Sequence, residues 1–94
     1  MSRSPFEIVS VDGGASTAHL VSTAGVNWIL LQEGSDLTLI DGGYPGQAGL
    51  VAESVARIGA RPEDIRGALI THGHVDHIGG LVTLHERYGF PVYA

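Results

Sequence analysis

The chain contains no cysteine and few basic residues. These two absences limit the kinds of metal ligand, nucleophile and binding partner that it can have. Without cysteine there is no disulfide framework and no thiolate to bind a metal or attack a substrate, so a metal ligand must be His, Asp or Glu. The 5 Lys and Arg residues are not clustered, and the formal net charge is −5 at pH 7. Because a basic surface is what binds a phosphate backbone, we expect no nucleic-acid partner.

Long hydrophobic runs are also missing. The longest apolar stretches have the length of a strand, at 28–31, 37–40 and 68–70, far short of the ~20 residues that cross a bilayer. The N-terminal residues 1–5 lack the apolar region of a signal peptide. These absences predict a cytoplasmic protein without a membrane partner. The composition, 44% hydrophobic and 16% charged, is otherwise that of an ordinary globular domain.

The hydrophobic pattern predicts strands first and then an alternation of helices and strands. Period-two or continuous apolar segments indicate strands, and apolar residues at i, i+4, i+7 or i, i+3, i+7 indicate two amphipathic helices. The expected strands are 6–11, 18–21, 26–32, 37–41, 65–71 and 92–94; one helix contains Val51, Val55 and Ile58 and stops at Gly59, and the other contains Leu81, Leu84 and Tyr88 and stops at Gly89. The segment 26–32 is apolar on both faces, which predicts a central strand covered from both sides.

This order of elements predicts the α/β fold class, with a mixed β-sheet and helices on one face. The strands that follow the helices are expected to be parallel neighbours. Residues 1–94 are expected to form a single partial domain, because the last strand has barely begun at Val92 when the sequence ends. We therefore expect an incomplete, truncated form of a longer domain.

Potential metal ligands are concentrated in one segment, His72 to His77, directly after an expected strand. Residues two apart in an extended segment point the same way, so His72 and His74 can present their imidazoles to one ion. Asp76 and His77 can face a second ion, where the loop turns towards a helix through Gly79 and Gly80. The carboxyl end of a strand is where open α/β sheets place their sites. Imidazoles with one carboxylate suit Zn²⁺ first, and iron or manganese less well.

Other polar residues have simpler interpretations. The His72 to His77 segment could be a solvated loop whose Asp76 caps the next helix, but so many histidines at ligand spacing disfavour that interpretation. Asp41-Gly42-Gly43 is a strand-ending turn or a support for the site, with nothing in the sequence to choose between them. His19 and His85 are expected to be packed or surface histidines, and we leave them out of the site.

The His-X-His-X-Asp-His pattern after a strand resembles the signature of the metallo-β-lactamase superfamily. The likeness covers residues 18–94 and includes the strand 37–43, which ends in Asp-Gly as in that family. It implies that the chain is the N-terminal half of a metallo-β-lactamase-like domain, one half of a four-layer αββα sandwich.

The resemblance also implies a chemistry. It assigns His72 and His74 to one zinc ion, Asp76 and His77 to another, and Asp41 to a supporting role; Asp76 is also our assignment for a catalytic residue. A metal-bound hydroxide would attack an ester, lactone, thioester, amide or phosphodiester. A catalytic zinc takes three protein ligands and a water. Each site is therefore incomplete here, and we expect a metallo-hydrolase that is inactive alone and active when missing residues or a partner complete it.

Two alternatives stay open. The chain could be a non-catalytic metal-binding half-domain that self-associates as a homo-oligomer, or pairs with another chain or a missing C-terminal half, because a lone half exposes an apolar sheet face and an unpaired edge. It could also use iron, as do dioxygenases of the superfamily that keep the histidine pattern. The redox di-iron branches carry Glu where this chain has His74, which favours hydrolysis. If the chain is active, its substrate is expected to be a small molecule.

Overall fold

The computed structural model describes residues 5–42, 46–71 and 75–93, and for residues 75–79 it describes the backbone only. Within these residues the chain forms strands, two α-helices and a short 3₁₀ turn. In chain order they are β1 (Glu7–Asp12), β2 (Thr17–Ser22), β3 (Asn27–Glu33), β4 (Asp36–Ile40), α1 (Ala48–Arg57), the 3₁₀ turn (Pro62–Asp64), β5 (Ile65–Leu69), α2 (Val75–Tyr88) and β6 (Val92–Tyr93).

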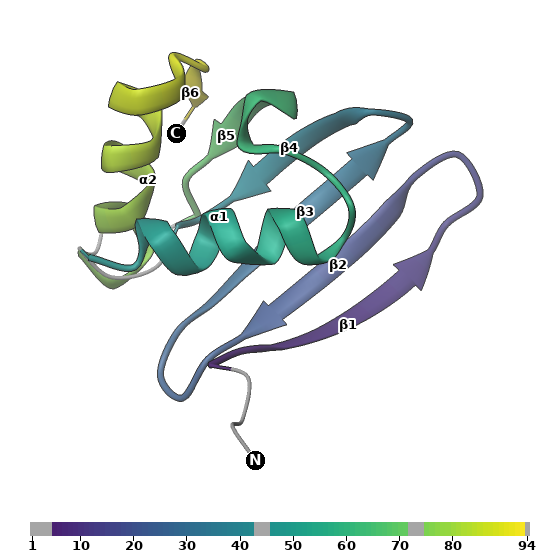
Figure 1. The fold of residues 1–94 in the computed structure, drawn as a ribbon, viewed down its shortest axis with the longest axis horizontal. Coiled ribbons are helices and arrows are strands. Elements are labelled where there is room, and N and C mark those ends of the chain that lie inside the picture. The colour runs from purple at the N-terminus through teal and green to yellow at the C-terminus, as the bar shows by residue number, and fades with distance from the viewer. Residues whose placement is uncertain (1–4, 43–45, 72–74, 94) are drawn as a thin grey trace.

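The described strands join one six-stranded sheet whose spatial order equals the chain order, β1-β2-β3-β4-β5-β6 (Figure 1). Neighbours from β1 to β4 are antiparallel because short turns connect them. The pairs β4–β5 and β5–β6 are parallel, and each is connected through a helix that crosses back over the sheet. The predicted mixed sheet, with parallel neighbours after the helices, is confirmed.

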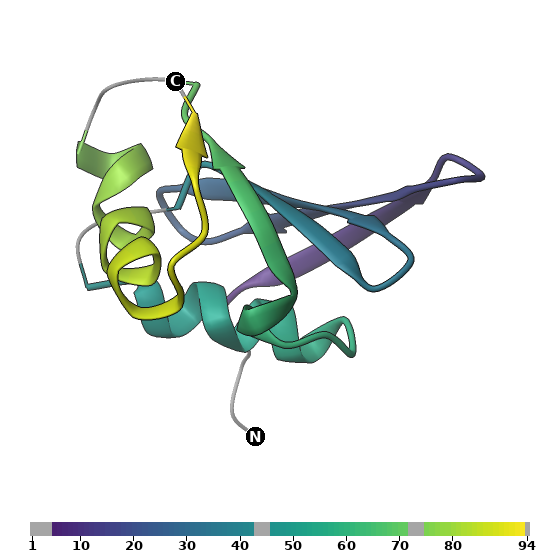
Figure 2. The same cartoon turned by 90° about the horizontal axis from the view of Figure 1, so that it is seen from above.

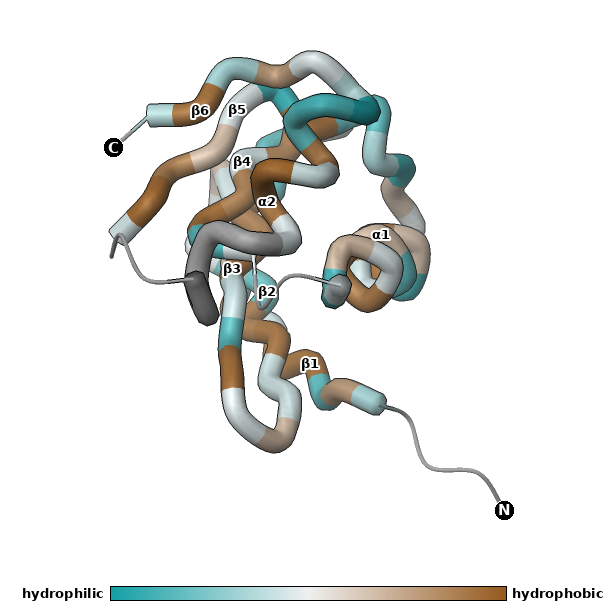
Figure 3. Tube along the Cα trace, turned by 90° about the vertical axis from the view of Figure 1, so that its left-hand side faces the viewer, coloured by the Kyte–Doolittle hydropathy of each residue, from teal (hydrophilic) through white to brown (hydrophobic). Residues whose placement is uncertain are grey.

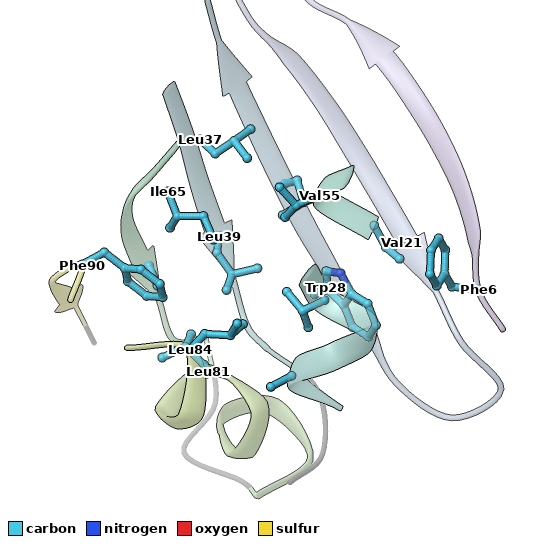
Figure 4. Close-up of a cluster of buried hydrophobic side chains, with 14 residues drawn as sticks. Phe6, Val21, Trp28, Leu37, Leu39, Val55, Ile65, Leu81, Leu84 and Phe90 are labelled. Carbon is cyan, nitrogen blue, oxygen red and sulfur yellow. The ribbon is translucent and has the colours of Figure 1, made fainter. Parts of the chain in front are cut away.

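Both helices lie on the same side of the sheet (Figures 2 and 3). The apolar residues that predicted α1 and α2 are the ones that face the sheet: Val51, Val55, Leu81 and Leu84 are all buried. Figure 4 shows Val55, Leu81 and Leu84 among the labelled side chains of the core. The core cluster consists of Phe6, Val21, Trp28, Leu30, Leu37, Leu39, Ala48, Val51, Val55, Ile65, Ala68, Leu81, Leu84 and Phe90.

The opposite face of the sheet carries a continuous row of apolar side chains. The pairing registers align one residue from every strand, in the order Val9, Leu20, Ile29, Ile40, Leu69 and Tyr93. At the two ends of the row, Val9 is 61% exposed and Tyr93 57% exposed. No described element covers this row, so β3 is fully buried on its helix side only. The prediction that β3 is covered from both sides is therefore wrong for the described residues.

The junction between β5 and α2 also differs from the prediction. The expected strand 65–71 ends at Leu69, and α2 begins at Val75, so the expected loop to His77 is shorter and its last residues are helical. Gly79 and Gly80 lie inside α2, where we expected a tight turn at the helix start. The sequence suggested a turn because glycine weakens a helix, but Gly80 is buried against another backbone segment. None of the described helices is both long and apolar enough to cross a membrane.

Candidate metal centre

The predicted metal ligands fall at the junction between β5 and α2. His72 and His74 lie outside the described residues, and their assignment stays a prediction. Asp76 and His77 lie in the first turn of α2, where the backbone alone is described. Among the side chains that the structure does describe, no group of three or more His, Cys, Asp or Glu could hold a metal ion.

The junction lies at the carboxyl ends of two parallel strands. β4 and β5 pair through Ile40 and Leu69. The pairing continues past β4, because the backbone N–H of Asp41 donates to the carbonyl of Leu69 over 2.9 Å. Asp41 and Thr71 therefore meet at one edge of the sheet. This edge, beyond the carboxyl ends of the strands, is the place where open α/β sheets bind their ligands.

The Asp41 carboxylate binds Thr71 at two points. Its Oδ1 accepts a hydrogen bond from the Thr71 backbone N–H at 3.0 Å, and its Oδ2 accepts one from the Thr71 hydroxyl at 2.6 Å. Hydrogen bonds to an ionised acceptor are shorter and stronger than neutral ones, and Asp41 is only 8% exposed. Because Thr71 directly precedes His72, this contact fixes the point where the predicted ligand segment begins.

Asp41 holds this position with an unusual backbone. Its φ is +64°, and no other non-glycine residue in the described part of the chain has a positive φ. Aspartate is one of the few side chains that enter the left-handed region at modest cost. The conformation turns the chain sharply at the end of β4. The two interpretations of Asp41, a strand-ending turn and a support for the site, are therefore compatible, since Asp41 makes the turn and also binds Thr71.

The next residue, Gly42, packs against α2. A Cβ atom at Gly42 would lie 2.5 Å from Leu81 Cβ and 2.6 Å from the Leu81 backbone nitrogen. A Cβ atom at Gly80 would collide with the carbonyl oxygen of Gly42. The two backbones can approach this closely only because both residues are glycine.

Two other histidines have structural roles, as expected. His19 is 7% exposed, and its ring contacts Ser10 Oγ at 2.7 Å and Gln32 Oε1 at 2.9 Å. The side chain of His85 at the end of α2 is exposed, and its Nδ1 donates to the carbonyl of Phe90 at 2.6 Å. Neither histidine belongs to the predicted metal centre.

The sequence reasoning missed two residues beside the centre, Thr71 and Gly80. The sequence pattern predicts Thr71 only as the last residue of a strand and Gly80 only as part of a turn. A usable signal was available for Thr71, because a hydroxyl directly before a ligand segment can bind a carboxylate from the neighbouring strand end. Gly80 carried no comparable signal, since its close contact depends on a residue far away in the sequence.

The chemistry of the predicted donors fits zinc. Neutral imidazoles and a carboxylate are among the ligands that Zn²⁺ takes in proteins. Hydrogen-bonded groups behind such ligands orient them and strengthen metal binding. The buried carboxylate of Asp41 binds Thr71, the residue before His72. The residue types at 72–77 are therefore ones that zinc binds, and the zinc site itself stays a prediction.

Comparison with known families and proteins shows what the chain is similar to. The family model described as the metallo-beta-lactamase superfamily matches residues 22–94. The exodeoxyribonuclease WalJ of Streptococcus pneumoniae is 36% identical over 81 residues, which are 86% of this chain and 29% of that protein. The probable metallo-hydrolase YflN of Bacillus subtilis is 34% identical over 74 residues, covering 78% of this chain and 28% of that protein.

The fold is shared with solved structures as well. BJP-1, a subclass B3 metallo-β-lactamase of Bradyrhizobium japonicum, superposes with a TM-score of 0.74 at 28% identity, over 80% of this chain and 28% of that chain. The chain thus spans less than a third of the length of each of these three proteins. Both the resemblance and the predicted α/β half-sandwich are confirmed.

Proposed function

The chain belongs to the metallo-β-lactamase superfamily, and from this premise we propose that it supplies the first half of a dinuclear zinc hydrolase. One observation carries the proposal: the His-X-His-X-Asp-His segment follows β5 at the strand edge where Asp41 binds Thr71. A second half, which provides the remaining zinc ligands, is part of the proposal because a catalytic zinc takes three protein ligands and a water.

Each residue has a defined task in this hydrolase. His72 and His74 bind one ion, and Asp76 and His77 bind the other. Asp41 holds Thr71 and thereby orients the start of the ligand segment. Bound zinc would supply a Lewis acid and would lower the pKa of a coordinated water towards about 7. No serine or cysteine nucleophile is needed.

The proposed substrate is an ester, lactone, thioester, amide or phosphodiester. The net charge of −5 and the scattered basic residues support a small molecule over a nucleic acid. One relative is named as an exodeoxyribonuclease, and for this reason phosphodiesters remain among the proposed substrate classes. A panel with one chromogenic compound from each class, together with single-stranded and duplex DNA, separates these substrates. The panel is run on the chain joined to its second half.

Metal analysis tests the centre directly. We expect the purified chain to bind zinc at a fixed, stoichiometric ratio. The His72→Ala, His74→Ala double variant should lose the ion that these two histidines are proposed to bind. Equal, substoichiometric zinc in both proteins would contradict the proposal. The iron-to-zinc ratio of a native preparation tests the iron alternative, because a dioxygenase would be recovered with iron.

The open sheet face favours a second candidate function. The apolar row from Val9 to Tyr93 crosses every strand of the sheet, and four of its six residues rank among the exposed large hydrophobic residues. Monomeric proteins rarely leave a contiguous apolar patch of this kind open. The chain could therefore act as a non-catalytic metal-binding half-domain that covers this face with a second copy or another chain. Light scattering tests self-association: a monodisperse monomer over a wide concentration range would argue against the homo-oligomer.

A further inference from the structure

A chain of hydrogen bonds links Ser10, His19 and Gln32 on the neighbouring strands β1, β2 and β3. Ser10 Oγ lies 2.7 Å from His19 Nδ1, and His19 Nε2 lies 2.9 Å from Gln32 Oε1. The turn that connects β1 to β2 extends away from α2, to the opposite end of the sheet (Figure 2). The group is therefore separate from the predicted metal centre at the start of α2.

The pairing of β1 with β2 brings the Ser10 and His19 side chains together. At the turn, the backbone N–H of Gly13 donates to the carbonyl of Ser16 at 2.8 Å, and the register continues without interruption to the pair Ser10–His19. Hydrogen-bonded and non-hydrogen-bonded pairs alternate along an antiparallel ladder, so Ser10 and His19 form a non-hydrogen-bonded pair, the kind whose side chains lie closer. Regular sheet geometry thus holds the hydroxyl against the imidazole.

The exposure of the linked side chains differs in the way that a nucleophile and its base require. Ser10 is exposed and Gln32 is half-buried, whereas His19 is only 7% exposed. In the tautomer with the hydrogen on Nε2, the His19 ring donates to Gln32 and accepts from Ser10. A hydroxyl within hydrogen-bond reach of a base that a third group orients is the arrangement that activates a nucleophile. A reagent can reach Ser10 from solvent while His19 stays fixed behind it.

The backbone of Ser10 places a donor beside its own hydroxyl. Because Ser10 occupies a non-hydrogen-bonded position opposite β2, its N–H points away from β2, towards the edge of the sheet. Within the described residues, no strand pairs with β1 on that side. The N–H of a nucleophilic serine can stabilise the oxyanion that forms when its hydroxyl attacks a carbonyl. Ser10 therefore combines a base and an oxyanion donor.

We propose that Ser10, His19 and Gln32 form a nucleophilic site, independent of zinc, at which Ser10 is acylated by small activated esters such as aryl esters. Ser10 Oγ attacks the carbonyl carbon while His19 Nδ1 takes the hydroxyl proton. The bond from that carbon to the leaving oxygen then breaks, and the imidazolium gives the proton to the leaving phenolate. The products are an acyl-serine and a phenol. Gln32 is a positioning residue that orients the ring.

The probe is p-nitrophenyl acetate, because its phenolate is coloured and its acetyl group adds a measurable mass. The chain contains no lysine, so the N-terminal amine is the only primary amine that competes for the ester. In excess chelator, we expect a stable acetyl group on the peptide that contains Ser10. Ser22, an exposed serine of β2, is the internal control and should stay unmodified. Equal acetylation of Ser10 and Ser22 would overturn the proposal.

Variants separate the roles of the linked residues. Ser10→Ala should abolish the acetylated peptide, and Ser22→Ala should leave it unchanged. His19→Gln removes the base and should slow acetylation of Ser10 by about 100-fold or more. Gln32→Leu removes the acceptor and should slow it by about tenfold or more, whereas Gln32→Glu keeps an acceptor and should retain the wild-type rate or exceed it. A folded Gln32→Leu variant with lower stability in urea and an unchanged acetylation rate would show that the role is only structural.

Nitrogen-15 NMR of the His19 ring tests the tautomer in the wild type, so this test stands even where a variant does not fold. We expect the hydrogen on Nε2. A hydrogen on Nδ1 would overturn the proposal, because the ring could not then accept the proton of Ser10. Every acetylation assay contains chelator, so its result does not depend on zinc binding. A chain that binds no zinc but acetylates at Ser10 would contradict the proposed hydrolase and support this site.

Discussion

The indole Nε1–H of Trp28 donates a hydrogen bond to Ser54 Oγ over 3.0 Å and so joins the middle of the sheet to α1. The Ser54 hydroxyl in turn donates to the carbonyl of Val51 at 2.7 Å, and Ser54 is fully buried. This small polar chain crosses an otherwise apolar core. It fixes how α1 is seated on β3, beside the end of β4, because Ile29 of β3 pairs with Ile40 of β4.

Replacing Ser54 with alanine leaves the buried indole N–H of Trp28 without an acceptor. We expect Ser54→Ala to lower the free energy of unfolding by about 1–3 kcal/mol, the cost of an unsatisfied buried donor. Urea unfolding in chelator measures the loss. Ser35→Ala in the exposed turn between β3 and β4 is the control and should change stability by no more than about 0.5 kcal/mol.

The His19 network on β1, β2 and β3 allows a test of paired substitution. His19 Nε2 contacts Gln32 Oε1 and Nδ1 contacts the Ser10 hydroxyl. In the tautomer with the hydrogen on Nε2, the ring donates to Gln32 and accepts from Ser10. Gln32→Leu should cost about 1–3 kcal/mol because it strands a buried N–H. The double variant His19→Leu, Gln32→Leu should recover most of that loss, since both polar partners are gone. Equal stability of the single and double variants would show that the network is not coupled.

The left-handed backbone of Asp41 predicts an order among its variants. Asp41→Asn keeps a side chain that tolerates φ of +64° and one carbonyl acceptor for Thr71. Asp41→Ala loses both acceptors and also meets the left-handed penalty of roughly 1–2 kcal/mol. We expect the alanine variant to be less stable than the asparagine variant by about that amount or more in chelator-containing urea. The reverse order would mean that the backbone conformation carries no strain.

If copies of the chain associate through the apolar row, a charge placed in the row should weaken that self-association. Leu20 is 41% exposed and stands in the row between Val9 and Ile29. Leu20→Lys should reduce self-association in light scattering with little effect on folding, because the ammonium group would have to be buried in any complex that covers this face. Ala56→Lys adds the same charge on the exposed side of α1 and serves as the control. If Leu20→Lys and Ala56→Lys self-associate equally, the contact between copies does not involve the apolar row.

The sequence by itself determined the order of the elements and which residues are predicted as metal donors. Both are local properties of the chain. The i, i+4, i+7 spacing of Val51, Val55 and Ile58 specifies a helical face whatever surrounds it. The His72 to His77 segment likewise offers imidazoles and a carboxylate irrespective of what it packs against, so the family and the half-sandwich fold could be recognised without coordinates.

Tertiary structure alone decided what surrounds that segment. Asp41 and Thr71 are 30 residues apart in the sequence, and they meet because β4 and β5 pair in parallel with one particular register. Gly42 and Gly80 touch because α2 packs back onto the end of β4, which also explains why Gly80 lies in a helix although its local preference is for a turn. Contacts of this kind depend on the distances between strands and helices in space. Side-chain periodicity along the chain carries no information about those distances.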